Sequence, residues 1–180
     1  MILSLDISTS CTGYCIFDKE GNLIKFGAID MSKEKSFFKK VDIVKSHLEE
    51  IFKTFDIDVA AIEESLQSFR SGFSSARTLF TLSKFNGIVQ YICYKEGIGL
   101  KTYNVNSARK LANIKIDRKA KATTKEQVAV QVEAIETNLT LPRKLLKSGP
   151  RKGTEVYENY VYDIADAYVI GKAYCVEKSL

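Results

Sequence analysis

The chain opens with MILSLDISTSCTGYCIFDKEGNLIKFGAID (residues 1–30), and the pattern of this stretch indicates the fold class. Three apolar runs follow one another here, at residues 1–7, 13–18 and 23–29. The pair Gly21-Asn22 separates the second run from the third, which is typical of a β-hairpin. The opening therefore predicts three strands, of which the last two pair antiparallel.

Beyond residue 30 the sequence alternates between helical and strand patterns. Apolar residues recur with helical spacing between Val41 and Phe55, and the run 59–62 is apolar throughout, like a strand buried on both faces. The pattern predicts a strand at 99–105 and helices at 74–96, 106–113, 123–137 and 160–177. The segment 138–160, rich in Pro and Gly, is typical of a loop. We expect one α/β domain over residues 1–180, with a mixed sheet flanked by helices.

The composition is that of a globular protein with a hydrophobic core. Of the 180 residues, 45% are hydrophobic and 27% are charged, and the mean hydropathy is −0.12. These values exclude a disordered or fibrous chain. No apolar run approaches the ~18 residues of a membrane span, and the N-terminus lacks the features of a signal peptide. We therefore expect a cytoplasmic protein with no membrane partner and with reduced cysteines.

Positive charge is concentrated in one segment. Residues 101–152 carry thirteen basic and four acidic side chains, a net charge of +9, whereas the remaining residues sum to −4. A basic segment on an acidic body is the electrostatic footprint of many nucleic-acid-binding proteins. A lysine-rich surface that only contacts solvent is an equally good interpretation of the charge alone.

Acidic residues mark the ends of two predicted strands and one face of a helix. Asp6 interrupts the first apolar run, and Glu63 and Glu64 follow the run 59–62. Asp163 and Asp166 lie three residues apart, so they share a face of the last helix. Each acid taken singly has a structural explanation, such as an ion pair or a strand that emerges into water. Together they imply a hard cation held by oxygen ligands.

The chemistry that suits such a cluster is phosphodiester hydrolysis. Two divalent ions about 3.5–4 Å apart activate water and stabilise the leaving oxygen. Mg²⁺ fits, because it binds carboxylates together with water and substrate phosphate, and we expect Mn²⁺ to substitute for it. Zinc is not indicated, because Cys11 and Cys15 lack partner ligands and the only histidine, His47, lies on a predicted surface helix.

Three motifs, in order along the chain, resemble those of the RuvC-type Holliday-junction resolvases, which belong to the RNase H-like superfamily. The motifs are LSLDISTSCTGY, AIEESL and DIADAYVIG, and the resemblance extends from residue 1 to about 175. It implies an RNase H-like five-stranded mixed sheet. It also implies a homodimer that binds branched DNA (four-way junctions) and makes paired symmetric nicks with two Mg²⁺ ions. The source would be bacterial, phage or viral.

The resemblance also implies roles for individual residues. Asp6 matches the first-strand aspartate, the Ala-Ile pair selects Glu63 over Glu64, and Asp163 and Asp166 match the paired aspartates of the last helix. Lys125 falls where the family places a lysine near the scissile phosphate. An ordinary surface lysine explains Lys125 equally well.

Further side chains are expected to contact DNA. These are Ser8, Thr9, Phe69, Arg70, Phe73, Arg77, Asn106, Arg109, Lys119 and Lys121. The family commonly has Asp-Pro-Gly in its first motif, whereas this chain has Ile7-Ser8 after Asp6, so the shape of that loop is expected to differ. Phe69 and Phe73 either insert at the junction centre and stack on bases or cap the core of a dimer. The dimer face is expected on the helix 74–96, through Leu79, Leu82 and Val89.

Three other functions are compatible with parts of the sequence. DISTSCTG resembles the phosphate-binding hairpin of the actin-like sugar kinases, but those chains need two such domains and several hundred residues. A DNA-binding module without catalysis is a second alternative, although all four carboxylates are present. The third is an RNase H-like enzyme that cleaves RNA–DNA hybrids, which only substrate preference separates from a resolvase.

Overall fold

A five-stranded sheet forms the centre of the computed structural model, which describes residues 1–64, 76–150 and 152–179. The strand order is β3-β2-β1-β4-β5. The strands are β1 (Ile2–Asp6), β2 (Cys11–Phe17), β3 (Leu23–Asp30), β4 (Val59–Glu63) and β5 (Gly99–Tyr103). Strands β1, β2 and β3 pair antiparallel, whereas β1, β4 and β5 are parallel neighbours. The predicted mixed sheet is confirmed, although β2 begins at Cys11 rather than at residue 13.

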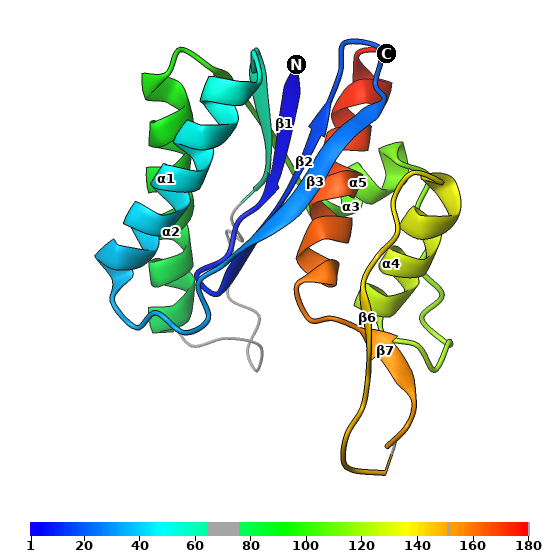
Figure 1. Ribbon diagram of the computed structural model, residues 1–180. Helices are drawn as coiled ribbons and strands as arrows, with labels where there is room; N and C mark the ends of the chain where they lie inside the picture. Colours follow the sequence, from blue (N-terminus) through cyan, green and yellow to red (C-terminus); the bar gives the residue numbers. More distant parts are fainter. Residues whose placement is uncertain (65–75, 151, 180) are drawn as a thin grey trace.

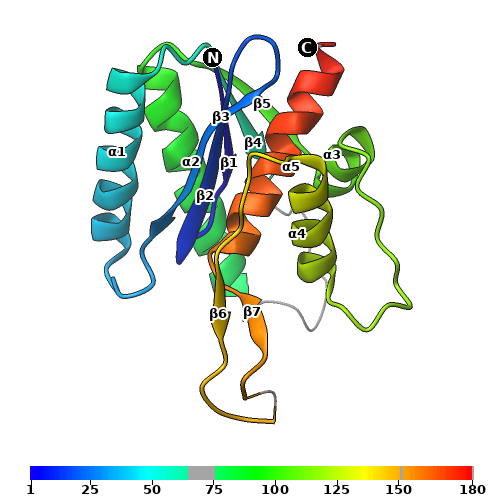
Figure 2. The same cartoon turned by 45° about the vertical axis from the view of Figure 1, so that its right-hand side comes forward.

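Helices cover both faces of this sheet (Figure 1 and Figure 2). On one face lie α1 (Phe37–Thr54) and α2 (Ala76–Lys95). On the other lie α3 (Val105–Leu111), α4 (Thr124–Ile135) and α5 (Val161–Glu177). Each corresponds to a predicted helix. Within the described residues, no helix combines the length and the apolar character needed to cross a membrane.

Side-chain alternation along β1 divides the core into two clusters. Leu3 and Leu5 pack beneath α1 and α2, whereas Ile2 packs beneath α3, α4 and α5. Ser4, the next residue on the Ile2 face, lies against Gly171 of α5. Because successive side chains of a strand point to opposite faces, Asp6 is on this same face. The register of β1 therefore directs Asp6 toward the last helix.

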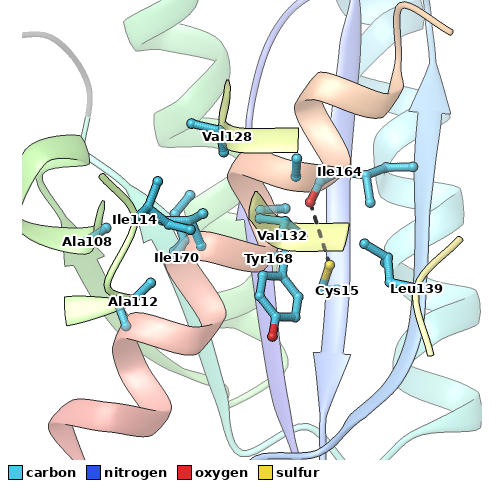
Figure 3. Close-up of a cluster of buried hydrophobic side chains, with 14 of the residues drawn as sticks. Cys15, Ala108, Ala112, Ile114, Val128, Val132, Leu139, Ile164, Tyr168 and Ile170 are labelled. Carbon is cyan, nitrogen blue, oxygen red and sulfur yellow. Dashed lines mark hydrogen bonds between the residues drawn. The ribbon is translucent and has the colours of Figure 1, made fainter. Parts of the chain in front are cut away.

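Helix α5 is the centre of the second cluster. Figure 3 shows Tyr168 and Ile164 of α5 packed with Val128 and Val132 of α4 against Cys15 of β2. The Cys15 thiol donates a hydrogen bond to the carbonyl oxygen of Ile164, with 3.7 Å between sulfur and oxygen. These contacts fix the N-terminal half of α5, which carries the two aspartates of the third motif, against the sheet.

The segment expected to be a loop contains a small hairpin. Strands β6 (Arg143–Leu145) and β7 (Glu155–Tyr157) pair antiparallel and project from the body beyond one end of the main sheet (Figure 1 and Figure 2). Gly149 and Gly153 have positive φ angles of 81° and 82°, which favour glycine at the connecting turn. The turn signals were read correctly, but three-residue strands are too short to show a hydrophobic period.

The predicted dimer face on α2 was wrong in one respect. Val89 of α2 is fully buried in the core cluster between the sheet and the helices α1 and α2, so it cannot contact a second copy. Leu79 and Leu82 are half-buried. The exposed face of α2 is rotated away from these residues and is described below.

Candidate active site

Parallel strands bring the first two acids to one edge of the sheet. Asp6 is the last residue of β1 and Glu63 is the last residue of β4. Leu5 of β1 pairs with Ile62 of β4 in the parallel ladder. Asp6 and Glu63 each follow one residue of this pair, so they lie next to each other on adjacent strands. The Asp6 carboxyl, when protonated, donates a hydrogen bond to the Glu63 carboxylate, which opposes the rise in the pKa of Glu63.

Gly13 allows α5 to approach this edge. Gly13 is the antiparallel partner of Asp6 in β2, and a Cβ atom at this position would lie 2.0 Å from the carbonyl oxygen of Asp163. No other residue fits there, because real Cβ contacts essentially never fall below 3.0 Å. Sequence reasoning missed Gly13, although an isolated glycine inside a strand is a recognised sign of close backbone approach.

Four carboxylates meet where β1, β4 and α5 converge. Burial raises the pKa of Asp6 well above its ordinary value, and the negative charges of Asp166, Glu63 and Asp163 raise it further. Burial is also the largest cause of the raised pKa of Glu63, to which the charge of Asp166 adds. The pKa values of Asp163 and Asp166 are raised mainly by burial as well. The cluster is therefore a desolvated concentration of negative charge.

Two cationic side chains flank these carboxylates. The Arg109 Nη2 atom lies 3.4 Å from Oδ1 of Asp166, and the Lys125 Nζ atom lies 3.8 Å from Oδ1 of Asp163. The Nε atom of Arg109 is buried and has no hydrogen-bond partner within the described part of the chain. Sequence analysis gave Arg109 a phosphate-binding role, whereas the structure places its guanidinium against an acid of the cluster.

Cys11, at the start of β2, is a second residue that sequence reasoning did not connect with the site. Its thiol forms a hydrogen bond to the Asp163 side chain. Burial, followed by the charge of Asp163, raises the pKa of the Cys11 thiol to about 12. The thiol therefore stays protonated and donates to Asp163, which offsets part of the rise that burial causes in the pKa of that aspartate.

The loop between β1 and β2 is shaped by the serine that stands where the family has glycine. The Ser8 hydroxyl accepts hydrogen bonds from the backbone N–H groups of Ser10 and Cys11, at 3.2 and 3.3 Å. The Lys40 amine of α1 donates to the Thr9 carbonyl oxygen at 2.5 Å. The altered motif is thus accommodated by a side-chain turn, and both predicted DNA contacts of this loop lie beside Asp6.

The remaining predicted DNA-binding residues are spread around the site. Arg77, Asn106, Lys119 and Lys121 are all exposed. Arg77 lies in the first turn of α2, Asn106 in α3, and the two lysines precede α4. Phe69, Arg70 and Phe73 fall outside the described residues, so the two hypotheses for these phenylalanines stay as stated.

The donor set fits Mg²⁺ better than a soft metal. It consists of four carboxylates, and hard divalent ions prefer oxygen ligands. No three His, Cys, Asp or Glu side chains within the described ranges lie close enough together to enclose one ion. Mg²⁺ does not require such a cage, because it usually keeps several waters and takes further ligands from substrate phosphates.

Solved structures of similar fold include two of RuvC. Thermus thermophilus RuvC in complex with a Holliday junction substrate superposes with a TM-score of 0.68 at 17% identity, over 99% of this chain and 94% of that one. The chain has the RuvC fold. A second Thermus thermophilus RuvC structure gives a TM-score of 0.61 at 17% identity, over 99% and 95% of the two chains.

A third RuvC-fold structure comes from a eukaryote. The yeast mitochondrial Holliday junction resolvase Ydc2 superposes with a TM-score of 0.59 at 15% identity, over 99% of this chain and 78% of that one. No protein-family model and no curated protein matches the sequence. The RuvC-type architecture expected from three short motifs is confirmed, and at these identities the likeness concerns the fold.

Proposed function

We propose that this protein is a metal-dependent endonuclease that resolves four-way DNA junctions by paired, symmetric nicks. The observation that carries the proposal is the convergence of Asp6, Glu63, Asp163 and Asp166 in one desolvated cluster. Like charges so placed repel one another unless cations bind between them. A junction is the proposed substrate because structures that share the fold include RuvC with a Holliday junction substrate and a Holliday junction resolvase.

The four carboxylates would hold two Mg²⁺ ions, and Mn²⁺ would substitute. Such ions, when bound, activate water and stabilise the charge that develops on the scissile phosphate and the leaving 3′-oxygen. Asp6 would be the central metal ligand, because it ends β1 beside Glu63 and is on the face of the sheet covered by α5, which carries Asp163 and Asp166. Glu63 and Asp163 would complete the metal shells, and Asp166 would either bind an ion or orient the water.

The two flanking cations have different roles. The Lys125 side chain is 57% exposed, so its amine can leave Asp163 and contact a substrate phosphate. The Arg109 side chain is only 18% exposed and stays beside Asp166. We assign Lys125 to the substrate and Arg109 to the orientation of Asp166. Other contacts with the DNA backbone are assigned to Ser8, Thr9, Arg77, Asn106, Lys119 and Lys121.

The exposed stripe of α2 is the proposed homodimer contact. It consists of residues spaced alternately four and three apart, as in a helix–helix seam: Phe80, Lys84, Gly87, Tyr91 and Tyr94. Phe80, Tyr91 and Tyr94 are 62%, 59% and 67% exposed. Gly87 costs helix stability, about 1 kcal/mol relative to alanine, and a Cβ there would meet nothing within 4 Å. A glycine that its own fold does not need suits close approach of a second copy.

A cleavage assay tests the proposal. Purified protein with Mg²⁺ is incubated with equal amounts of a labelled four-way junction, a duplex of the same sequence and an RNA–DNA hybrid. Asp6→Asn and Asp58→Asn are assayed alongside, because Asp58 is an exposed aspartate that pairs with the N-terminal amine, outside the cluster. The expected result is symmetric nicking of the junction by the wild type and by Asp58→Asn, and none by Asp6→Asn.

Other outcomes would contradict the proposal in recognisable ways. Preferential cleavage of the hybrid would assign the protein to RNase H-like chemistry on RNA. Junction binding without cleavage of any substrate, with Mg²⁺ or Mn²⁺, would indicate a DNA-binding module and a structural role for the carboxylates. Loss of junction binding in Asp6→Asn would indicate a folding defect and require Glu63→Gln as a second test.

A further inference from the structure

The β6–β7 hairpin is an arm with a rigid base. Glu133 of α4 accepts hydrogen bonds from the Leu141 backbone N–H at 2.9 Å, from Arg143 at 2.5 Å and from the Tyr157 hydroxyl at 2.9 Å. The Arg143 guanidinium also lies over the Tyr157 ring, 4.5 Å from its centroid. One carboxylate of α4 therefore holds both strands of the hairpin, through residues on each.

The charges at the base of the arm are neutralised within the protein. Arg143 pairs with Glu133, and Lys144 pairs with Glu158 at 2.9 Å. A groove of about 660 Å³ along the hairpin is lined by Arg143, Lys144, Leu145, Leu146, Lys147, Glu155 and Glu158. The basic side chains at the base of the arm are thus used in internal ion pairs. Unpaired positive charge is found only toward the tip, among the residues that the structure describes.

The tip of the arm is cationic. Lys147 and Lys152 are exposed and form no ion pair with any residue that the structure describes. Backbone hydrogen bonds lie on both sides of residue 151, from Gly153 N–H to the Leu146 oxygen at 2.8 Å and from Lys152 N–H to the Gly149 oxygen at 3.1 Å. Two exposed amines without an acidic partner, close together on one hairpin, make a surface that attracts anions.

The arm projects from the same end of the molecule as the carboxylate cluster. Figure 1 and Figure 2 both show the hairpin projecting past the end of the sheet at which β1 and β4 finish and α5 begins. The second strand leads into α5 within a few residues, so Glu158 precedes Asp163 by only five positions. At ~3.3 Å per residue, the tip extends up to about 20 Å beyond Arg143. A nucleic acid cut at the cluster would extend alongside this arm.

We propose that the hairpin tip binds the phosphate backbone of a duplex arm of the substrate, outside the cut site, through Lys147 and Lys152. The inference rests on the proposed function, since it takes the bound molecule to be DNA. The chemistry is sequence-independent, because amines on a turn recognise phosphate charge and carry no base information. The arm therefore contributes affinity and orientation.

The test compares two double variants in junction binding. Lys147→Ala/Lys152→Ala removes the tip amines, and Lys19→Ala/Lys53→Ala removes two exposed lysines from the opposite end of the molecule. Affinity for a labelled four-way junction is measured in EDTA between 50 and 300 mM salt. Loss of two phosphate contacts should weaken binding at least about tenfold at 0.1 M salt and reduce the log–log salt slope by about 2. The control variant should match the wild type.

Failure of this inference is distinguishable from failure of the proposed function. A wild-type protein that cleaves the junction, with a tip variant of unchanged affinity and salt slope, would overturn the hairpin assignment alone. A wild-type protein that neither binds nor cleaves the junction would overturn both. Equal weakening at every salt concentration would also contradict the inference, because contact with phosphate charge must depend on salt. Thermal unfolding of the tip variant should match that of the wild type.

Discussion

The carbonyl oxygen of Asp163 occupies the space that a side chain on Gly13 would need, since a Cβ atom there would lie 2.0 Å from it. Gly13 is also the cross-strand partner of Asp6. A single glycine therefore sets the distance between the aspartate of the first strand and the aspartate of the last helix. The carboxylate cluster can form only if α5 packs this closely on the sheet.

Gly13→Ala should displace the start of α5 and weaken the protein. The methyl group must push against backbone, which costs about 1–3 kcal/mol, the usual range for overpacking. We expect a lower Tm and a loss of junction cleavage that exceeds the loss of binding. Gly99→Ala in β5 is the matched control, because its Cβ would meet ordinary contacts of 3.4 and 3.5 Å. Wild-type cleavage by Gly13→Ala would contradict the packing argument.

Asp6→Asn should stabilise the metal-free protein while it removes cleavage. The substitution removes an ionisable group whose charged form is disfavoured by burial and by three other carboxylates, so the free energy of unfolding should rise. Each kcal/mol gained corresponds to about 2–4 °C in Tm for a chain of this size. Asp58→Asn should do the reverse, because the N-terminal amine lowers the pKa of Asp58. A lower Tm for Asp6→Asn in EDTA would show that Asp6 is needed for folding.

The metal-free protein should become more stable as the pH falls from 7.5 to 5.5. The cluster carboxyls have raised pKa values in the folded state, so they bind protons more readily there than in the unfolded chain. Their contribution to stability is complete below the ordinary carboxyl pKa of about 4 and is lost as the pH rises through the raised values. Thermal melts in EDTA measure this, and Asp6→Asn should flatten the profile. A Tm that falls over this interval would be inconsistent with the cluster.

Charges on the exposed stripe of α2 should separate the proposed dimer. Tyr91→Glu/Tyr94→Glu places two like charges on each copy of the contact, which should convert a dimer into a monomer in sedimentation or light-scattering measurements. Phe38→Glu on α1 is the control, because Phe38 is 73% exposed but lies outside the stripe. A wild-type protein that is monomeric at micromolar concentrations would remove the dimer from the proposal.

Most of the framework was predictable because its signals are local. The Gly-Asn turn and the apolar runs gave the first three strands, and the alternating pattern gave the helices. Asp6 stood out because a carboxylate is disfavoured within an apolar strand. The two strand-end acids followed from parallel pairing, which joins equivalent ends of β1 and β4.

What was missed depends on tertiary contacts. Val89 has helical spacing with Leu82. Only the packing of α2 beside α1 on the sheet shows that the face of α2 that carries Val89 is covered by the chain itself. Arg109 and Asp166 are 57 residues apart, so no sequence pattern joins them. The β6–β7 hairpin has strands too short for periodicity, and it is held by Glu133 from another element.

The distribution of the four carboxylates along the chain has a consequence for the order of folding. Asp6 and Glu63 lie within the first 63 residues, whereas Asp163 and Asp166 belong to the last helix. During synthesis the sheet emerges first, and the cluster stays incomplete until α5 docks, a contact of very long sequence separation. If the proposed function is correct, a partly synthesised chain could not cleave nucleic acid until α5 has packed on the sheet. Destabilising α5 should abolish the site before the sheet is lost.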